Sequence, residues 1–266
     1  MPEGHTVHRT ANQFNEYFAG KALAVSSPQG RFSSGAKLVD GVRLEKAWAV
    51  GKQMLLDFEN ELTIRIHLGI YGKWSFVKLD GAMPEPVGQV RARFASNEWL
   101  VDLRGPTVCD VTPSAEAHET LKRLGPDPLN PDPTGEERNR FVANVQSSRK
   151  PIGLLLMEQS VISGVGNVYR AELLFRAGID PQRPGQSVPR ELIESIWQDA
   201  VKLMKVGEAT GNMITRDELL SELPEKSERY FVYKREGLPC RLCGSDTRIG
   251  LMATRKLYWC PKCQSA

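Results

Sequence analysis

Four cysteines near the end of the chain have the spacing of a metal site. Cys240 and Cys243 form one Cys-x-x-Cys pair, Cys260 and Cys263 form a second, and 16 residues separate the two pairs. Each pair can present two thiolates to one tetrahedral ion, and this spacing is typical of a four-thiolate zinc site. Because four protein ligands leave no open coordination position, we expect one structural Zn²⁺ that takes no part in catalysis. Two disulfides are the alternative, and a reducing compartment disfavours them.

The opposite end of the chain carries a different chemistry. The sequence begins Met1-Pro2-Glu3, and removal of the initiator methionine would leave Pro2 with a free secondary amine. An α-amino group titrates at about 7.7–8.0 against about 10.4 for lysine, so far more of it is neutral at pH 7. A neutral amine can form a Schiff base with an aldehyde-level carbon while the neighbouring carboxylate moves protons. Taken alone, such a start is also that of a chain end without a role.

A glycine-containing turn is a candidate anion site. The chain reads Gly164-Val-Gly166-Asn167 between two predicted helices. The glycines permit a tight turn with outward-facing N–H groups, and the dipole of the following helix favours a phosphate there. Taken alone, the pattern favours an ordinary turn between helices.

Composition limits the class of protein. The 266 residues are 41% hydrophobic and 25% charged, which excludes disordered, collagen-like and coiled-coil chains and fits one large or two modest domains. No apolar run approaches the roughly 18 residues of a membrane span, and the first residues lack a signal peptide's apolar segment. We therefore expect a cytoplasmic protein with reduced cysteines, among which Cys109 is a buried residue without a function.

The net charge of +3 is unevenly distributed along the chain. Residues 225–266 hold nine Lys and Arg against four Asp and Glu, an excess of +5, which leaves −2 for the other 224 residues. This distribution predicts phosphate contact at the C-terminal segment. A solvated basic face is the alternative.

The elements that must position these residues follow from periodicity and turn signals. Apolar residues at helical spacing predict an amphipathic helix over residues 7–18, ended by Gly20. Short alternating segments from 23 to about 111 predict a sandwich or barrel. Four prolines between 125 and 133 indicate a linker. Thr134 to Glu137 has the form of a capping box.

Helical patterns follow over residues 136–145, 151–157, 168–177 and 189–206. We therefore expect a multi-domain α+β protein: a β-sandwich with a leading helix over residues 1–120, a proline-rich linker over 121–135, a helical domain over 136–225, and a C-terminal β-hairpin zinc ribbon over 226–266. Short strands at Arg248–Gly250 and Leu257–Trp259 would form the hairpin.

Taken together, these features resemble the formamidopyrimidine-DNA glycosylase / endonuclease VIII family. The resemblance runs through nearly the whole chain, and its motifs stand in the family's order. Besides the Pro-Glu start and the four cysteines, they are Gly51-Lys52, His67–Gly72, Leu124–Leu129, Leu156–Glu158, Gly164–Glu172 and Arg255–Gln264. The resemblance implies that the helical domain is a helix–two-turns–helix domain.

The resemblance also implies roles for individual residues. Pro2 would attack the sugar carbon of a nucleotide flipped out of damaged double-stranded DNA and expel the base, while Glu3 acts as the general acid/base. Lys52 would approach the lesion phosphate, although a solvated turn lysine is the alternative. Asn167 and Arg255 would contact phosphates, the latter through a bidentate guanidinium.

Flipping a nucleotide leaves a void that a wedge usually fills. Ile70 and Tyr71 match the wedge positions of endonuclease VIII, and Arg104 matches an arginine of the family. Gly69 departs from the larger polar side chain of endonuclease VIII, so that the void would be filled less well or from elsewhere. The phenylalanine that oxidised-purine enzymes carry beyond Arg104 is absent, and Gly153 replaces their lysine.

The Ile70–Tyr71 pair, the missing phenylalanine and Gly153 favour the endonuclease VIII branch. That branch implies a monomeric glycosylase and abasic-site lyase that excises oxidised pyrimidines by β,δ-elimination. An oxidised-purine glycosylase and a non-enzymatic binder of damaged DNA are the alternatives. Two further residues keep open roles: His67 is a structural residue or a DNA contact, and Glu172 either hydrogen-bonds near the active site or is a solvated helix carboxylate.

Overall fold

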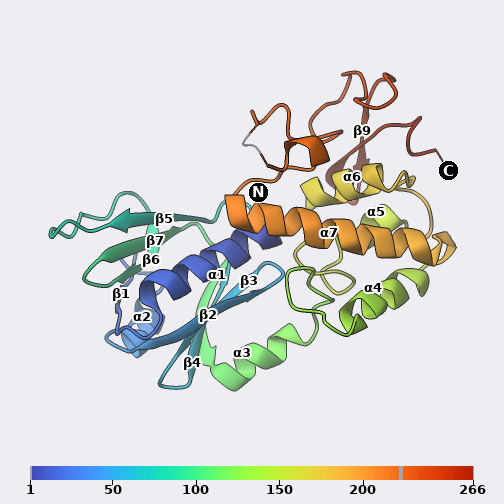
Figure 1. The fold of residues 1–266 in the computed structure, drawn as a ribbon. Helices are drawn as coiled ribbons and strands as arrows, with labels where there is room; N and C mark the ends of the chain where they lie inside the picture. The colour runs from blue at the N-terminus through green and yellow to red at the C-terminus, as the bar shows by residue number, and fades with distance from the viewer. Residues whose placement is uncertain (1, 222–223, 266) are drawn as a thin grey trace. The chain divides into compact units, whose positions relative to one another are not determined.

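The computed structural model describes residues 2–221 and 224–265. The chain divides into two compact units, residues 1–122 and 123–266, and each is described by itself (Figure 1). The division falls just after helix α3 (Ser114–Leu121), before the proline-rich segment. No helix in the described part of the chain is long and apolar enough to cross a membrane.

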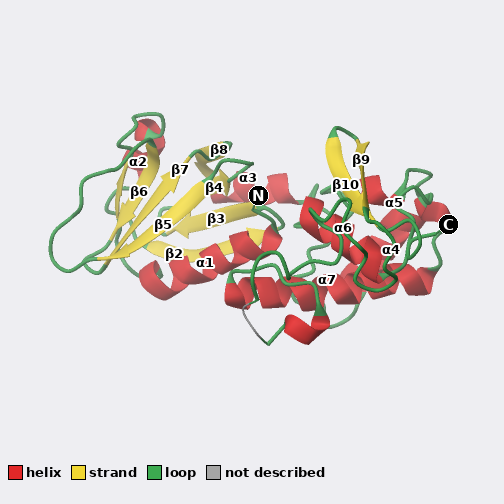
Figure 2. Cartoon of the chain, turned by 90° about the horizontal axis from the view of Figure 1, so that it is seen from above, coloured by secondary structure: helices red, strands yellow, loops and turns green. Residues whose placement is uncertain are grey.

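The first unit is built on two antiparallel four-stranded sheets (Figure 2). One has the order β1 (Ala24–Ser26), β6 (Val90–Ala95), β7 (Trp99–Arg104), β5 (Lys73–Lys78). The other has the order β2 (Leu44–Val50), β3 (Gln53–Phe58), β4 (Leu62–His67), β8 (Val108–Pro113). The prediction of many short strands is confirmed, because alternate residues of these segments point into one apolar core.

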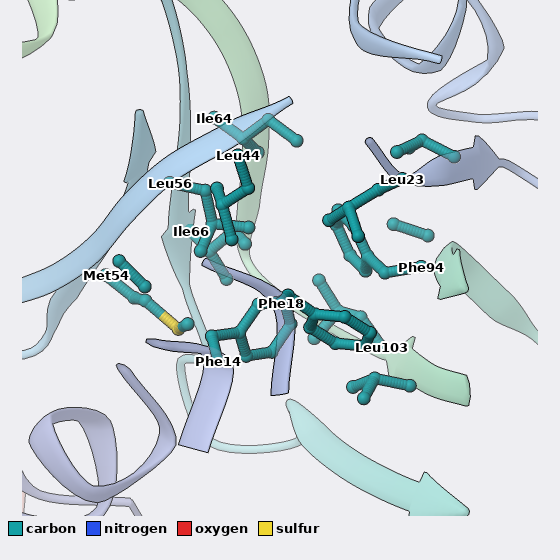
Figure 3. Packing of buried hydrophobic residues seen from close by; sticks show 14 of the residues in the cluster. Phe14, Phe18, Leu23, Leu44, Met54, Leu56, Ile64, Ile66, Phe94 and Leu103 are labelled. Atoms are coloured by element: carbon teal, nitrogen blue, oxygen red, sulfur yellow. The ribbon is translucent and has the colours of Figure 1, made fainter. Parts of the chain in front are cut away.

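Helix α1 (Gly4–Phe18) supplies the aromatic centre of this core. Phe14 and Phe18 are fully buried. Figure 3 shows them between Met54 and Ile66 on one side and Phe94 on the other. The predicted amphipathic helix is therefore confirmed, and its apolar stripe joins the inner faces of the strands.

Hydrogen bonds fix the direction of α1 along the edge strand β2. The side chain of Asn15 donates to the Ala47 carbonyl and accepts from the Ala47 N–H, both at 2.7 Å. Further along the chain, the N–H of Gly20 donates to the Leu44 carbonyl at 2.8 Å. Helix α1 and strand β2 therefore run antiparallel. Gly20 ends the helix as predicted, with a φ of +78° that favours glycine.

A short helix, α2 (Ser33–Val39), completes the first unit. The described residues of the second unit form four α-helices, two 3₁₀ turns and a β-hairpin. The helices are α4 (Glu136–Gln146), α5 (Ile152–Leu155), α6 (Asn167–Arg176) and α7 (Arg190–Thr210). The 3₁₀ turns are η1 (Gly185–Ser187) and η2 (Asp217–Leu219), and the hairpin is β9 (Arg248–Met252) with β10 (Arg255–Trp259). The predicted helices and hairpin are confirmed, although the helix predicted over 151–157 is only one turn long.

The capping box predicted at Thr134 is wrong. Gly135 occupies the N-cap of α4 with a φ of +75°, and no side chain bonds from that position. The Asp132 carboxylate instead accepts the N–H groups of Glu137 and Arg138 at 3.1 and 3.0 Å. The left-handed turn at Gly135 brings an earlier acid to the free N–H groups of the first helical turn.

Candidate active site and nucleic-acid interface

The Pro2-Glu3 pair is held at the start of helix α1. Glu3 is the N-cap residue, with extended φ and ψ of −122° and 178°, and its carbonyl accepts the Thr6 N–H at 3.0 Å. Its side chain is fully buried, whereas Pro2 is half-buried. Carboxylates are rarely buried in full. Removal of Met1 would leave an amine on Pro2, and a buried acid next to a partly accessible amine is the arrangement that proton transfer to and from that amine requires.

His5 gives this helix start a neutral lining. It is buried, and its Nε2 lies 3.1 Å from the Thr6 hydroxyl. Burial lowers the pKa of His5 to about 4, and the charges of the chain's amino terminus and of His8 act in the same direction. His5 is therefore uncharged at neutral pH and adds no positive charge beside Pro2.

Lys52 lies in the two-residue turn between β2 and β3. Val50 pairs with Gln53 across the turn, and Gly51 adopts a φ of +58°, which favours glycine. Gln53 pairs in turn with His67 on β4. Burial lowers the pKa of His67, and the charge of Lys52 lowers it further. Lys52 is thus close to the end of β4.

Glu3 and Lys52 lie at the same end of the first unit. From Asn15 back to Glu3, helix α1 extends about 18 Å at about 1.5 Å per residue. From Ala47, which is hydrogen-bonded to Asn15, the chain advances about 17 Å to Lys52 at about 3.3 Å per residue. Because α1 and β2 are antiparallel, the two paths end level with each other. Glu3 and Lys52 are 49 positions apart in the sequence, and the fold places them at the same end of the unit.

The candidate wedge follows directly after β4. Ile70 and Tyr71 expose 58% and 83% of their surface, large values for apolar side chains. Gly69 has a φ of +65°, and the N–H of Gly72 closes the loop on the Leu68 carbonyl at 2.9 Å. The loop over residues 68–72 therefore presents two bulky side chains to solvent from the sheet end near Lys52.

Arg104 is engaged within the first unit. Its guanidinium donates to the Asp102 carboxylate at 2.9 Å, the Ser75 hydroxyl at 2.7 Å and the Val87 carbonyl at 2.9 Å. Asp102 also binds Arg93 in a buried bidentate pair with distances of 2.8 and 3.0 Å. Direct contact between Arg104 and DNA stays a prediction, since these bonds already hold three sides of the guanidinium.

In the second unit, the glycine turn and the hairpin meet at Asn167. Its Nδ2 donates to the Lys256 carbonyl at 2.9 Å, and its Oδ1 accepts from Arg170 at 2.5 Å. Arg170 is buried and donates to the same Lys256 carbonyl at 3.0 Å. Arg255, the neighbour of Lys256, is exposed at the start of β10. The structure thus brings together two residues that the sequence predicted as phosphate contacts.

Glu172 is a structural anchor, and the prediction of a solvated carboxylate is wrong. Its side chain is fully buried on α6 and accepts the Thr215 hydroxyl at 2.5 Å. It also accepts three consecutive backbone N–H groups at 2.8–2.9 Å, those of Phe231, Val232 and Tyr233. Most of the residues around Glu172 on helix α6 are apolar, among them Ala171, Leu173 and Phe175, and that pattern predicts a buried helix. The sequence therefore carried a signal for this acid.

The four C-terminal cysteines form one cluster. Their Sγ atoms all lie within 4.8 Å of one another; the Cys240–Cys263 distance is 3.8 Å and the Cys243–Cys260 distance is 3.5 Å. A tetrahedral ion with Zn–S bonds of about 2.3 Å requires sulfur separations of about 3.8 Å. A disulfide would require about 2.05 Å. The cluster therefore fits a four-coordinate metal ion.

Cys109 stands apart from this cluster on β8. It is half-buried beside the core of the first unit. Burial raises the pKa of its thiol to about 12, so the reactive thiolate is absent at neutral pH. The residue is less buried than the sequence suggested, and its lack of a function stays a prediction.

Comparison with known proteins identifies the family. The sequence model of the formamidopyrimidine-DNA glycosylase N-terminal domain matches residues 1–109, and that of the formamidopyrimidine-DNA glycosylase H2TH domain matches residues 124–218. The chain belongs to the formamidopyrimidine-DNA glycosylase / endonuclease VIII family. As a member of this family it is an enzyme, a DNA glycosylase of DNA repair.

Relatives span the whole length of this family member. It is 46% identical over 273 residues to endonuclease 8 1 of Mycobacterium tuberculosis, with 100% of both chains covered. It is 26% identical to an Escherichia coli endonuclease 8, with 99% of this chain and 100% of that one covered.

Solved structures show the same fold. MutM (Fpg) from Thermus thermophilus superposes with a TM-score of 0.78 at 27% identity and covers 99% of this chain and 98% of its own. A complex of Lactococcus lactis Fpg with abasic-site DNA gives a TM-score of 0.80 at 18% identity, covering 99% of this chain and 100% of that one.

Proposed function

We propose that this glycosylase excises oxidised pyrimidines from damaged double-stranded DNA and then cleaves the backbone as an abasic-site lyase. The observation that carries the proposal is the helix start, where buried Glu3 adjoins the half-buried Pro2 and Lys52 lies at the same end of the unit. A nucleophilic amine, a general acid/base and a cation for phosphate are the groups that this chemistry needs.

In the proposed reaction, Met1 has been removed, and the neutral amine that this exposes on Pro2 attacks the C1′ carbon of the flipped nucleotide. The bond to the damaged base breaks, and the base leaves with a proton. Glu3 protonates the ring oxygen as the sugar opens, which gives an iminium ion on Pro2. Loss of a C2′ proton then expels the 3′ phosphate, and a second elimination expels the 5′ phosphate. Lys52 would bind the lesion phosphate.

The second unit would hold the DNA backbone. Asn167 is joined through Lys256 to Arg255, which belongs to the predicted basic C-terminal segment. One Zn²⁺ bound by the four cysteines would fix the hairpin that carries Arg255. The zinc would be structural, since all four coordination positions belong to protein.

Three features support oxidised pyrimidines over oxidised purines as substrates. Ile70 and Tyr71 stand together as exposed bulky residues. No phenylalanine follows Arg104 in the segment before β8. A Cβ at Gly153 would lie 2.8 Å from the Met252 sulfur and 3.0 Å from the Pro181 carbonyl, so a lysine there would require these neighbours to move. The endonuclease 8 names of the relatives agree with this branch.

The oxidised-purine glycosylase remains the second candidate, because the solved neighbours of this fold are Fpg proteins. We further propose that the enzyme acts as a cytoplasmic monomer, where its thiols stay reduced for zinc. A non-enzymatic binder would not need a buried acid beside the terminal amine.

Borohydride trapping tests the proposed nucleophile. The enzyme is incubated with abasic duplex and borohydride, and the adduct is located by peptide mass spectrometry. We expect a covalent complex on Pro2, and Lys78→Ala, at an exposed position of β5, serves as the control that leaves trapping intact. An adduct on another residue, or binding without any adduct, would contradict the proposal.

A comparison of two lesions tests the substrate class. If the enzyme belongs to the pyrimidine branch, we expect it to excise thymine glycol at least tenfold faster than 8-oxoguanine.

A further inference from the structure

Two loops of the first unit pack into one body beside the exposed Ile70 and Tyr71. One is the loop over residues 68–72 after β4, and the other is the connection over residues 105–107 between β7 and β8. The N–H of Thr107 donates to the His67 carbonyl at 2.9 Å, which continues the pairing of β4 with β8 by one step. The second loop is therefore fixed against the base of the first.

The closest approach between the loops is at Gly69. A Cβ built on Gly69 would lie 1.9 Å from the Thr107 hydroxyl oxygen and 3.1 Å from its Cβ. Non-bonded atoms do not approach so closely, so any side chain at position 69 would displace the side chain of Thr107. The φ of +65° at Gly69 adds a separate penalty, since left-handed backbone costs a non-glycine residue about 1–2 kcal/mol.

A second close approach joins the loops at their tips. Gly105 has a φ of +59°, and a Cβ there would lie 3.2 Å from the Tyr71 carbonyl. Thr107 is exposed, as are Ile70 and Tyr71. The Thr107 hydroxyl has no hydrogen-bond partner among residues 2–221 and 224–265. An exposed hydroxyl thus stands unpaired beside two exposed bulky side chains.

We propose that Thr107 is the third member of the wedge and occupies the space that a side chain at position 69 would fill. Ile70 and Tyr71 provide apolar surface for the vacated stack. The Thr107 hydroxyl hydrogen-bonds the base opposite the flipped nucleotide, because a hydroxyl can donate to or accept from a base edge. This assignment rests on the proposed glycosylase function, and it makes Thr107 a determinant of opposite-base preference.

The steric part of the proposal is tested by a double-mutant cycle. The variants are Gly69→Gln, Thr107→Gly and the double variant, and the readout is the Kd for a duplex that contains a stable abasic analogue. We expect Gly69→Gln alone to weaken binding at least tenfold and the double variant to return within about threefold of wild type. A Gly69→Gln variant that binds like wild type, or a double variant no better than Gly69→Gln, would overturn the assignment.

The hydrogen-bonding part is tested by Thr107→Val, which keeps the shape and removes the hydroxyl. The affinity is measured against duplexes with each of the four opposite bases. We expect the affinity for the duplex with the preferred opposite base to fall about fivefold, the equivalent of one neutral hydrogen bond. The differences in affinity among the four duplexes should therefore become smaller. Thr112→Val, on β8 five residues after Thr107, is the matched control, and it should leave the differences in affinity among the four duplexes unchanged. Equal losses for all four bases would refute the hydrogen bond.

Borohydride trapping of each variant on preformed abasic sites separates this inference from the proposed function. Trapping is expected in all variants, because Pro2 and Glu3 are unaltered. Absence of trapping in the wild-type enzyme would overturn the proposed function itself. Normal trapping with unaltered affinities would overturn the role of Thr107 alone. Melting temperatures of the variants report whether the loops still fold.

Discussion

The side-chain amide of Asn167 donates a 2.9 Å hydrogen bond to the carbonyl of Lys256, 89 residues away in the sequence. The bond joins the first turn of α6 to the first residues of strand β10. Arg255, the proposed phosphate contact of the hairpin, is the adjacent residue. The position of one proposed DNA contact therefore depends on the other, and the two are expected to act as a unit.

Removal of this link is expected to weaken DNA binding. Asn167→Ala deletes one of the two side-chain bonds to the Lys256 carbonyl, and it removes an acceptor that positions Arg170, which makes the other. The backbone beside Arg255 is then held less firmly. We expect the Kd for abasic duplex to rise about tenfold, with the same loss in an Asn167→Ala/Arg255→Ala double variant as in Arg255→Ala alone. Fluorescence anisotropy measures both. Fully additive losses would show that the two residues act independently.

Glu172 is expected to be a large contributor to the stability of the second unit. The two oxygens of the Glu172 carboxylate accept four hydrogen bonds in total. Glu172→Gln replaces one of these oxygens by an NH₂ group, which cannot accept a bond from the N–H groups that face it. An unsatisfied buried group costs about 1–3 kcal/mol, and the free energy of unfolding should fall by about that amount. Urea denaturation checks the value. Glu191→Gln, at an exposed position of α7, is the control and should change stability by less than about 0.5 kcal/mol.

Metal removal is expected to abolish DNA binding through the second unit and to leave the fold of the first unit intact. The enzyme should contain one zinc per chain by elemental analysis, and Cys260→Ser should lower that content. Chelation should abolish DNA binding, because the hairpin that carries Arg255 loses its anchor. The core around Phe14 contains no cysteine ligand, so its near-ultraviolet circular dichroism should persist. Retained DNA binding after complete zinc loss would contradict the proposed role of the metal.

His5 is expected to make the protein less stable in mild acid. Its pKa in the folded state is about 4, below the ordinary 6.5, and the cause is mainly burial. Below pH 6.5 His5 is therefore protonated in the unfolded chain, whereas in the folded chain it stays neutral until about pH 4. Stability is fully present above pH 6.5 and falls by up to about 3 kcal/mol as the pH drops to 4.

Denaturation of wild type and His5→Gln between pH 7 and 4.5 measures this contribution. The difference between the two curves should change with pH, because the glutamine does not titrate. His118→Gln, at a more exposed position, is the control. Parallel curves for wild type and His5→Gln would exclude His5 as the source of the acid sensitivity.

The sequence alone determined the features that depend on local spacing. Two Cys-x-x-Cys pairs predicted the cysteine cluster, because each pair brings two thiolates together within one turn of chain. Apolar periodicity predicted helix α1 and the short strands, because burial of one face imposes that period. The order of several motifs predicted the family. None of these inferences required knowledge of which distant segments meet.

Only the tertiary structure decided the features that depend on contacts between distant segments. The fold buried Glu172 beneath Phe231–Tyr233, committed Arg104 to Ser75, and placed Thr107 over Gly69. Each is a polar group or a glycine whose local pattern permits several roles. Its partner lies tens of residues away or in another loop, and the packing of whole elements sets that distance. A one-dimensional pattern shows which residues are capable of chemistry, and the folded chain decides which of them have partners already.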